Sequence, residues 1–556
     1  MTSHAEAKNI SRTFAGEGAG EKLFKSLEYL NQIGAALSQE RNLDKLLETI
    51  LLAAKNITNA DGGTLYRVVE DKLKFEIVLN DSLKIAMGGT SGAPVPFYPI
   101  PLHAAADGRE NNGMVAAYVA LHDETVNIAD AYAAEGFDFS GTRAFDSKTG
   151  YRSQSFLTIP MKSHEGEIIG VLQLLNALDA DGQVSPFTVE DQRLAESLAS
   201  QAAIAVTNRM LITQLEDLFE SLIELINTAI DEKSPYTGGH CERVPTLTMM
   251  LAEAASEVKE GPLAVFKMTD KDRYELKIAG LLHDCGKITT PVHVVDKATK
   301  LETIFDRVHH VTQRFEILKR DAEIKMLRAK IAAQALGDDA SAARAKQDFV
   351  AHIRQLDEDR EFVRRVNVGG ERMSADDQAR VNRIAAYAFK DETGKKATFL
   401  SNEERDSLNI PYGTLSQPER EIINHHIIAT IKMLEALPWP RHLKRVPEYA
   451  GGHHERMDGK GYPRGLTREQ MSVQARVMGI ADIFEALTAK DRPYKPGKTL
   501  SESLHILGKF KENGHIDPDL FDVFVRQKVY LKYAQQFLDQ VQIDSVDEAK
   551  IPGYRV

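Results

Sequence analysis

Residues 453–466, HHERMDGKGYPRGL, guide the interpretation of the rest of the chain. Two adjacent histidines and an acid precede a glycine-rich turn that ends in Gly461-Tyr462-Pro463. Neighbouring side chains lie only about 100° apart on a helix, so the two histidines could reach one metal cluster from two directions. The alternative is a pair of surface histidines on a polar loop. Whether the stretch belongs to a metal site therefore depends on ligands supplied elsewhere in the chain.

Length and composition indicate a multidomain globular protein. A chain of 556 residues is too long to fold around a single hydrophobic core. Its hydrophobic fraction of 43% and charged fraction of 27% are ordinary for globular proteins. A formal net charge of −12 argues against bulk binding of nucleic acid or of an anionic membrane. Two cysteines are too few for a disulfide framework. Because there is no signal pattern and no apolar run of about 18–20 residues, the sequence predicts a cytoplasmic protein without a membrane span.

The first part of the chain predicts an α+β domain at residues 23–208. Residues 1–22 are polar and are expected to form a flexible tail. Helical spacing of apolar residues covers 27–37, 43–57 and 187–208. The β-like runs are 63–69, 74–79, 156–161 and 168–178. The last two runs flank a turn-rich segment and indicate a hairpin, so the sheet is expected to be antiparallel with flanking helices.

A long helical pattern follows, in which the apolar residues adopt a tighter rhythm. Alternating steps of four and three residues separate Leu211, Leu215, Leu218, Leu222, Leu225 and Ala229. This spacing is typical of a coiled coil. The sequence therefore predicts a coiled-coil signalling helix at 209–232 that joins two copies in a homodimer. A single amphipathic helix packed on its own domain is the alternative.

Histidines and aspartates recur in the helical second half of the chain. His240 stands where a helix is expected to begin, and the adjacent His283 and Asp284 end an apolar helical run. His426 lies within a helical pattern. Asp482 interrupts an apolar helix, where an unpaired carboxylate is costly and needs a partner such as a metal. Imidazole and carboxylate donors of this kind suit iron, manganese or zinc better than magnesium or calcium.

Residues 306–414 differ from their surroundings, because they are rich in arginine, glutamate, alanine and glutamine. They predict a charged helical hairpin inserted into an all-α domain at 233–556. Its three histidines, His309, His310 and His352, are expected on solvated helix faces, away from the metal donors. A lid over the site or a second dimer contact is the functional alternative for this insertion.

The N-terminal domain resembles a GAF domain, in particular those of cyclic-nucleotide phosphodiesterases and adenylyl cyclases. The resemblance rests on NIADAY (127–132), FDSKTGYRSQSFLTIPM (145–161) and the segment that begins GVLQLLNA (170–177). Asn176, Phe187 and Asp191 match the signature of those domains. Ala177 and Gln192 replace its lysine and glutamate. The resemblance implies a sensory pocket for a cyclic nucleotide or another small molecule, with a ligand-free dimerisation module as the alternative.

The second half resembles the HD-GYP phosphodiesterases over residues 233–305 and 415–538. Four motifs occur in the order of that family: TGGHCERV (237–244), LLHDCGK (281–287), HHERMDGKGYPRGL (453–466) and ADIFEALTAKDRPYK (481–495). The resemblance implies hydrolysis of cyclic di-GMP to pGpG, or further to GMP, by a hydroxide that bridges two divalent metal ions. Iron or manganese is expected, with zinc, nickel or magnesium as alternatives.

The resemblance also implies the metal ligands, position by position. One metal would be held by His240, His283, Asp284 and Asp482. Asp284 would bridge to a second metal held by His426, His453 and His454. The spacing from Glu419 selects His426 over His425. Tyr236 stands where some members have a glutamate ligand for a third metal, so two metals are expected.

Substrate contacts are implied in the same way. Lys287 would contact a phosphate and, with Asp284, carry the catalysis, while Arg492 and Lys495 would add positive charge. The loop beside the substrate would contain Asp458, Gly461, Tyr462 and Pro463. Two other functions remain: a catalytically silent module that binds a cyclic dinucleotide or docks a partner, and an HD-type hydrolase of another nucleotide. The complete ligand set and Lys287 favour the enzyme.

Overall fold

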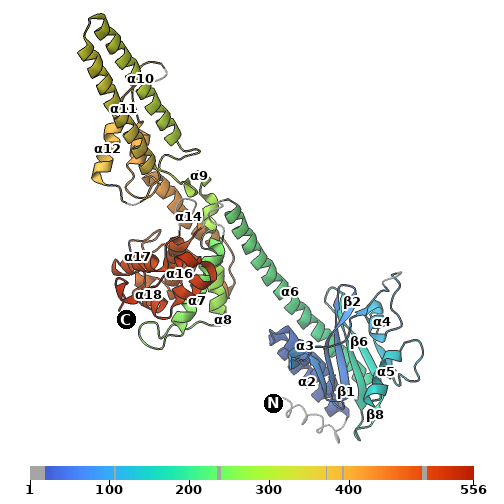
Figure 1. Cartoon of the computed structure of the whole chain (residues 1–556). Coiled ribbons are helices and arrows are strands. Elements are labelled where there is room, and N and C mark those ends of the chain that lie inside the picture. The colour runs from blue at the N-terminus through green and yellow to red at the C-terminus, as the bar shows by residue number, and fades with distance from the viewer. Residues whose placement is uncertain are drawn as a thin grey trace. The chain divides into compact units, whose positions relative to one another are not determined.

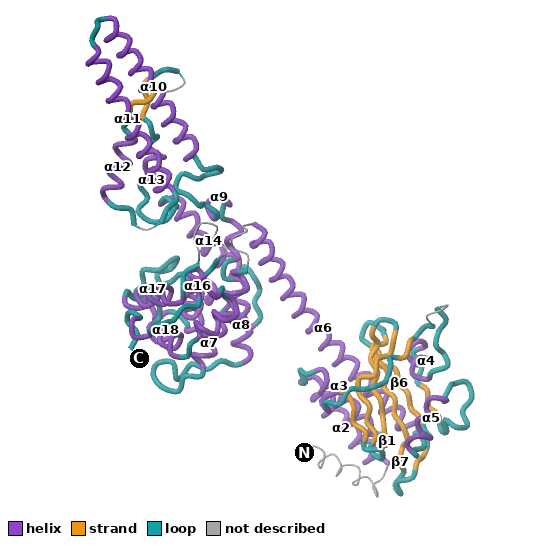
Figure 2. Tube along the Cα trace, viewed as in Figure 1, coloured by secondary structure: helices purple, strands orange, loops and turns teal. Residues whose placement is uncertain are grey.

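The computed structural model describes residues 19–104, 108–233, 239–370, 372–390, 393–490 and 497–555, and gives only the backbone of 19–27. The chain divides into two compact units, Met1–Phe219 and Glu220–Val556. The first contains an antiparallel sheet with helices, and the second is largely helical (Figures 1 and 2). The predicted fold class is therefore confirmed. No described helix has both the length and the apolar character needed to cross a membrane.

One antiparallel sheet forms the centre of the first unit. Its strands follow the order β3-β2-β1-β7-β6-β5, while β4 pairs with β2 and β8 with β7. The bounds are β1 Ala60–Val69, β2 Lys72–Asn80, β3 Ile85–Gly88, β4 Ile100–Pro101, β5 Val126–Ile128, β6 Phe156–Lys162, β7 Ile168–Leu178 and β8 Val184–Ser185. The predicted hairpin at 156–178 is the β6–β7 pair, in which Phe156 lies opposite Leu175.

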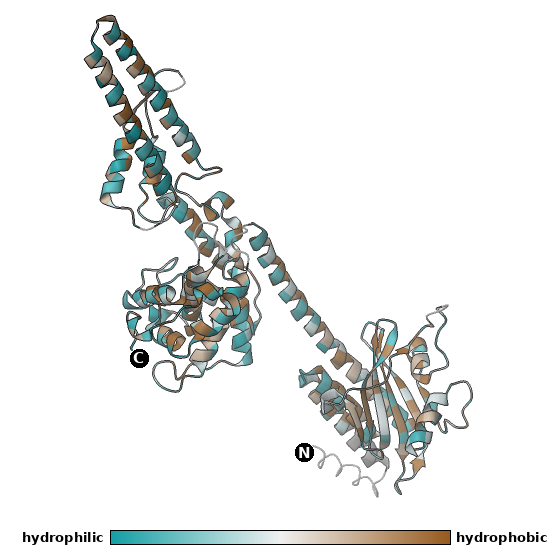
Figure 3. Ribbon diagram, in the orientation of Figure 1, coloured by the Kyte–Doolittle hydropathy of each residue, from teal (hydrophilic) through white to brown (hydrophobic). Residues whose placement is uncertain are grey.

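Two separate apolar cores lie in the first unit. One contains buried residues of the sheet together with α2 (Ala19–Gln39), α3 (Leu43–Ile57) and the start of α6 (Val189–Lys233). The other is built around α4 (Val115–His122) and the residues before α5 (Ser140–Thr149). Figure 3 shows the apolar residues along the sheet and on the helix faces that cover it. The predicted helices at 27–37 and 43–57 are confirmed.

Two boundaries differ from the sequence prediction. Helix α2 begins at Ala19, within the segment predicted to be a flexible tail, and residues 1–18 lie outside the described part of the chain. The predicted helices at 187–208 and 209–232 form one continuous helix, α6, of 45 residues. No glycine or proline occurs within α6, so the sequence offers no residue that would end it earlier.

The predicted coiled-coil seam of α6 is exposed in the single chain. Leu215, Leu218 and Leu225 are 70%, 60% and 63% exposed. In the part of α6 that belongs to the second unit, Ile223 and Ile230 are buried instead. The helix thus keeps one apolar face covered by its own chain and leaves a second one open, while the coiled coil itself remains a prediction.

A helical bundle forms most of the second unit. Its elements are α7 His240–Ser256, α8 Asp270–Leu282, η2 Cys285–Thr289, α9 Val292–Val295, α14 Gln417–Glu435, α15 Val446–Gly451, α16 Val473–Thr488, α17 Leu500–Glu512, α18 Pro518–Arg526 and α19 Val529–Phe537. Helix α7 packs against α8, α16, α18 and α19, and α14 packs against η2 and α15. Capping boxes at Thr269, Ser416 and Thr499 fix the starts of α8, α14 and α17.

The insertion is a small subdomain rather than a helical hairpin alone. The hairpin of α10 (Val308–Ala335) and α11 (Asp339–Asn367) is present as predicted (Figure 1). It is followed by α12 (Ala375–Ala385), a two-stranded sheet of β9 (Ala388–Lys390) and β10 (Lys396–Thr398), and α13 (Asn402–Leu408). These elements share their own core with α10 and α11, which includes Phe315, Leu356, Phe362 and Phe399. His309, His310 and His352 are exposed on the hairpin, as expected.

Candidate metal centre

All seven predicted metal ligands lie together in the second unit, although they come from five parts of the chain. His240 is the first residue of α7, and His283 and Asp284 follow the end of α8. His426 lies within α14, His453 and His454 follow α15, and Asp482 lies within α16. The donor atoms form two groups, and within each group they lie within 4.8 Å of one another. The first group, site A, consists of His240, His283, Asp284 and Asp482; the second, site B, consists of His426, His453 and His454.

In site A, two imidazole nitrogens face two carboxylates. His240 Nε2 lies 3.0 Å from Asp284 Oδ2 and 3.4 Å from Asp482 Oδ1. His283 Nε2 lies 3.2 Å from the same oxygen of Asp284 and 3.9 Å from Asp482 Oδ1. The carboxylate of Asp482 thus has the neighbours that its position in an apolar helix required.

Asp284 lies between the two sites. Its Oδ2 faces site A, whereas its Oδ1 lies 3.3 Å from His426 Nε2 in site B. Within site B, His454 Nε2 is 3.2 Å from His426 Nε2, and the ring centroids of His453 and His454 are 4.1 Å apart. The two oxygens of Asp284 therefore face the two donor groups separately, and a bridging role between two metal ions remains a prediction.

Backbone carbonyls orient three of the histidines. Nδ1 of His283, His426 and His453 lies 2.7, 2.5 and 2.6 Å from the carbonyl oxygen three residues earlier. A carbonyl oxygen can only accept, so each Nδ1 carries the proton and each Nε2 keeps its lone pair. The three lone pairs point to the centre of the cluster, which is the tautomer that a metal ligand needs.

His240 is oriented by a carboxylate instead. Its Nδ1 lies 2.7 Å from Glu485 Oε2, and Glu485 Oε1 accepts a hydrogen bond of 2.7 Å from Arg243. Glu485 is only 1% exposed. Burial acts to lower the pKa of His240, but the hydrogen bonds with Asp284 and Glu485 raise it to about 9. Hydrogen bonds and charge interactions with His240 and Arg243 lower the pKa of Glu485 to about 2 against the effect of burial, so Glu485 is a fixed negative charge behind His240.

Unpartnered buried atoms indicate that the cluster fits divalent metal ions. Nε2 of His283, Nε2 of His453 and Oδ1 of Asp284 are buried and have no hydrogen-bond partner among the described residues. Buried polar atoms are normally satisfied, and leaving three unsatisfied in one place is costly. Lone pairs of imidazole and carboxylate at these separations are the donors that iron, manganese and zinc prefer.

Lys287 places a positive charge at the edge of the cluster. Its Nζ contacts Asp284 Oδ2, and its side chain is 23% exposed. Burial acts against both charges, yet Asp284 raises the pKa of Lys287, and Lys287 helps hold the pKa of Asp284 well below its ordinary value. Both groups are therefore ionised at neutral pH. Burial also lowers the pKa of His453 to about 4, so its ring is neutral and ready to act as a ligand.

The loop after His454 folds back onto the cluster. The ring of Tyr462 stacks on His454 with centroids 4.8 Å apart and planes 22° from parallel. The Tyr462–Pro463 bond is cis. A Cβ atom on Gly461 would lie 2.3 Å from the nitrogen of Arg456, so only glycine fits there. The loop therefore contacts His454, one of the predicted metal ligands, through the ring of Tyr462.

Two carboxylates hold this loop. The buried Glu455 accepts hydrogen bonds from the backbone nitrogens of Arg464, at 2.7 Å, and Leu466, at 2.9 Å. Asp458, predicted to contact substrate, instead pairs with Arg456 and accepts from the nitrogen of Lys460. Its carboxylate maintains the turn, and a substrate contact by Asp458 remains a prediction.

Other predicted site residues lie elsewhere or outside the described residues. His425 is exposed on α14, whereas its neighbour His426 is buried in the cluster. Arg492, Lys495 and Tyr236 lie outside the described residues, so their predicted roles stay predictions. Glu485 and Glu455 were not predicted. An acid three residues after Asp482 in the same apolar helix was the available signal for Glu485.

The predicted GAF ligand residues make internal contacts. Asn176 is 1% exposed; its Oδ1 accepts from the nitrogens of Gln154 and Ser155, and its Nδ2 donates twice. These bonds use the hydrogen-bonding groups of the Asn176 side chain, and its ligand role remains a prediction. Phe187 lies in the core, and Asp191 accepts from Thr188 at the start of α6. For these two residues the ligand role remains a prediction.

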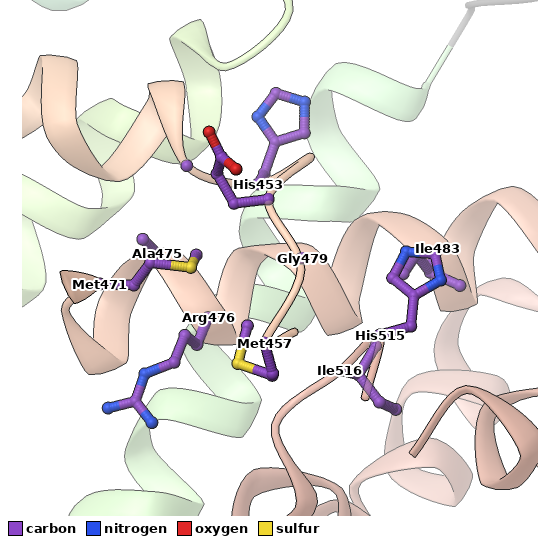
Figure 4. Close-up of a pocket in the computed structure, with 11 residues that line it drawn as sticks. His453, Met457, Met471, Ala475, Arg476, Gly479, Ile483, His515 and Ile516 are labelled. Carbon is purple, nitrogen blue, oxygen red and sulfur yellow. The ribbon is translucent and has the colours of Figure 1, made fainter. Parts of the chain in front are cut away.

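A small cavity lies beside His453, between the loop and α16 (Figure 4). Met457, Met471, Gly479 and Ile516 contribute to its lining. The volume open to the centre of a water molecule is about 10 Å³, room for a single water. This cavity is therefore too small for a nucleotide and belongs to the packing behind the histidine.

Three family models match the chain. The model described as GAF domain matches residues 42–206, and two described as HD domain match residues 237–365 and 404–520. The GAF match covers the sheet of the first unit. The two HD matches contain every residue of sites A and B. An HD domain implies divalent metal binding, for which the two donor groups are the candidate ligands.

Curated relatives share segments of this chain. A cyclic di-GMP phosphodiesterase of Pseudomonas aeruginosa is 39% identical over 119 residues, which cover 21% of this chain and 27% of the relative. A 3′3′-cGAMP-specific phosphodiesterase of Vibrio cholerae is 46% identical over 81 residues, covering 15% and 19%. A dual cyclic-AMP and cyclic-GMP phosphodiesterase of Takifugu rubripes is 33% identical over 123 residues, covering 22% and 13%. The chain thus matches about a quarter or less of the length of these relatives.

The domain content follows from these matches together with the fold. An antiparallel sheet with flanking helices occupies the matched GAF segment, and a helical bundle with a two-part histidine and aspartate cluster occupies the matched HD segments. The chain therefore contains a GAF domain and, following it, an HD domain.

Proposed function

We propose that the chain is a metal-dependent phosphodiesterase that hydrolyses cyclic di-GMP to linear pGpG, with further cleavage to GMP as the alternative end point. The observation that carries the proposal is the position of Asp284. Its two oxygens face two separate donor groups, and Lys287 contacts the oxygen that faces site A. A shared carboxylate between two cation sites is the arrangement used for in-line displacement at phosphorus. The printed names of the Pseudomonas and Vibrio relatives support a cyclic dinucleotide as the substrate class.

The donor set favours iron or manganese. Five imidazoles and two carboxylates suit these ions, with zinc, nickel or magnesium as alternatives. Two divalent ions bound there would supply Lewis acidity toward the phosphate and a hydroxide nucleophile at neutral pH. His283, His426 and His453 hold their Nε2 lone pairs toward them, because each Nδ1–H is already committed to a carbonyl.

Lys287 is proposed to bind the phosphate that is attacked. Its ammonium is charged at neutral pH and is partly exposed beside Asp284, so it can reach an anion placed over the cluster. Charge on the phosphoryl oxygens grows during the displacement, and a fixed cation there stabilises the transition state more than the ground state. The stacked ring of Tyr462 and the cis bond to Pro463 shape the same side of the site.

The test is a turnover assay with defined metals. Purified protein is incubated with cyclic di-GMP and Mn²⁺ or Fe²⁺ under reducing conditions, and the products are separated chromatographically beside Asp284→Ala. We expect pGpG from the wild type and no product from the variant. Absence of turnover with every metal, or equal turnover by the variant, would contradict the proposal and favour a silent binding or docking module.

A second candidate substrate is a mixed cyclic dinucleotide. The relative named as 3′3′-cGAMP-specific shares the highest identity of the relatives described above, 46% over its matched segment. The same assay with 3′3′-cGAMP in place of cyclic di-GMP separates the two. A kcat/KM for 3′3′-cGAMP higher than that for cyclic di-GMP would identify the mixed dinucleotide as the preferred substrate.

The GAF domain is proposed to regulate the HD domain within a homodimer. A single helix, α6, begins in the first unit and ends in the second, and its leucine seam is exposed. The proposed ligand of the GAF domain is a cyclic nucleotide or another small molecule. Calorimetry with cyclic AMP and cyclic GMP, combined with the turnover assay, tests it; no binding and an unchanged rate would leave a dimerisation module.

A further inference from the structure

His283 of site A is backed by a neutral backbone carbonyl, as are two histidines of site B, but the other histidine of site A has a different support. In site A, His240 is backed by the carboxylate of Glu485, at 2.7 Å. In site B, His426 and His453 are backed by neutral carbonyls. Within the part of the chain that the structure describes, no hydrogen bond reaches Nδ1 of His454. Its ring is covered by Tyr462 instead, with a centroid separation of 4.8 Å.

The two sites also differ in charge. Site A contains the carboxylates of Asp284 and Asp482, with Glu485 directly behind a ligand. Site B contains three imidazoles and shares only the second oxygen of Asp284. Lys287 and Arg243 offset part of the negative charge around site A, yet three carboxylates still outnumber two cations. A divalent cation is therefore attracted more strongly to site A than to site B.

Support by a carboxylate has a further effect on His240. A hydrogen bond from Nδ1–H to an anion fixes the ring and increases the electron density at Nε2, and loss of such a partner typically weakens metal binding about 10- to 100-fold. Glu485 is itself held by Arg243 at 2.7 Å, so its position is defined before any metal binds. Nothing comparable fixes His454, which relies on the face of an aromatic ring.

We propose that Glu485 and Tyr462 are positioning residues, one for each site, and that site A therefore binds its metal ion more tightly than site B. The proposal rests on the function proposed above, because it concerns the same cluster. It follows that site B is the half whose occupancy responds to metal supply. Tyr462 belongs to the GYP loop, so that loop supports a metal ligand in addition to shaping the substrate side.

The test is a titration of the metal-free full-length protein with Mn²⁺, followed by calorimetry and by metal content after dialysis. We expect two binding steps in the wild type whose affinities differ at least about 10-fold. Glu485→Gln keeps the shape of the side chain but removes its charge, and should weaken the first step about 10-fold or more while leaving the second in place.

Tyr462 is tested with a matched pair of variants. Tyr462→Phe keeps the ring that covers His454 and should titrate like the wild type. Tyr462→Leu removes the ring and should weaken only the second step, by about 10-fold. Glu404→Gln, a buried carboxylate in the insertion, is the control for loss of a buried charge and should change neither step.

If Glu485→Gln does not fold because the charge of Glu485 no longer faces Arg243, Glu485→Gln combined with Arg243→Gln removes both charges and should show the same weakened first step. A single step of equal affinity in the wild type overturns the proposal. So does a Glu485 variant with an unchanged first step, or a Tyr462→Phe variant as weak as Tyr462→Leu. These titrations contain no nucleotide, so a protein that binds two metals as described but does not hydrolyse a cyclic dinucleotide would refute only the proposed function.

Discussion

At the scale of single residues, Lys287 combines a charge with partial exposure beside a buried carboxylate. If its ammonium stabilises the attacked phosphate, Lys287→Met should lower kcat by about 10²- to 10³-fold. The metal content should stay that of the wild type, because Lys287 is not among the metal-donor groups. Steady-state kinetics together with metal analysis check this. Lys550→Met, whose side chain is 83% exposed, is the control and should leave both unchanged.

Gly286 is a second residue with a defined physical constraint. A Cβ atom there would lie 2.0 Å from the carbonyl oxygen of His426 and 2.5 Å from the nitrogen of Thr430. Gly286→Ala should therefore push η2 away from α14 and destabilise the protein by about 1–3 kcal/mol. Urea unfolding measures this. Gly370→Ala, where a Cβ atom meets nothing within 4 Å, should change stability by less than about 0.5 kcal/mol.

The residues of the cluster were largely predictable, because their motifs are long and each ligand has a distinctive neighbour. His283 and Asp284 follow an apolar run, and Asp482 interrupts one. The supporting residues were less so. Nothing in the sequence says that Glu485 lies behind His240, 245 residues earlier, since that contact exists only after α7 and α16 pack together. Likewise, the stacking of Tyr462 on His454 depends on how the loop returns.

At the scale of elements, the end of α6 contacts η2, the short helix that contains Lys287. Nζ of Lys233, the last residue of α6, lies 3.2 Å from the carbonyl oxygen of Lys287 and also contacts that of Ile288. Because a hydrogen bond from a charged group contributes about 1.5–3 kcal/mol, Lys233→Met should loosen η2 and lower kcat about 10-fold. The binding of Mn²⁺ should change less than the rate.

The control for this prediction lies on the same interface. Lys277 lies on α8 and forms an exposed ion pair of 3.1 Å with Glu220 of α6. Lys277→Met should leave kcat unchanged, because an exposed pair contributes little. Equal losses in the two variants would show that any disturbance of α6 lowers the rate, and would contradict a specific role for the contact with η2.

A pH effect is expected in the insertion. Arg314 makes two hydrogen bonds, of 2.7 and 2.9 Å, to the buried Glu404. Burial acts to raise the pKa of Glu404, but Arg314 and the backbone of Ser401 lower it below its ordinary value. The stability from this pair is therefore complete above about pH 4.5 and is lost as the pH falls through the folded pKa.

Scanning calorimetry at several pH values checks that effect. Glu404→Gln should destabilise the insertion at pH 7 by about 1–3 kcal/mol, because it leaves Arg314 without its charged partner. The difference from the wild type should shrink as the pH falls below about 4.5, because the carboxyl of the unfolded chain is protonated there and that of the folded chain is protonated at lower pH. A difference that stays constant down to pH 3 would contradict the assigned pair.

The elements show why the sequence predicted the long helices better than the short strands. Apolar spacing revealed the pattern of α3, whereas the short strands β3, β4 and β8 are too brief to produce a periodic signal. In the insertion, the spacing identified α10 and α11 as helices. It could not reveal the core that Phe315 shares with Phe399, because these residues meet only through tertiary packing.

At the scale of the whole molecule, the seam of α6 predicts the oligomeric state. Leu218 is 60% exposed, so replacing it should not disturb the folded chain but should remove an apolar contact from a paired helix. Leu218→Glu should convert a dimer to a monomer in sedimentation velocity experiments. Glu216→Ala, outside the seam, should remain dimeric. A wild type that sediments as a monomer at all concentrations tested would contradict the prediction of a dimer formed through the leucine seam of α6.

The insertion also affects how the histidine and aspartate cluster forms during folding. Gly286 and Thr430, which join η2 to α14, are 144 residues apart in the chain. Closing so long a loop costs entropy and slows folding. However, Lys300 donates to the carbonyl of Ile410, 110 residues later, and the segment between them has its own core. Once that segment has folded, it holds its two ends together. The loop that must then close to join η2 to α14 is effectively much shorter than 144 residues. The insertion therefore adds length to the HD domain with little kinetic penalty, and its folding should precede closure of the metal cluster.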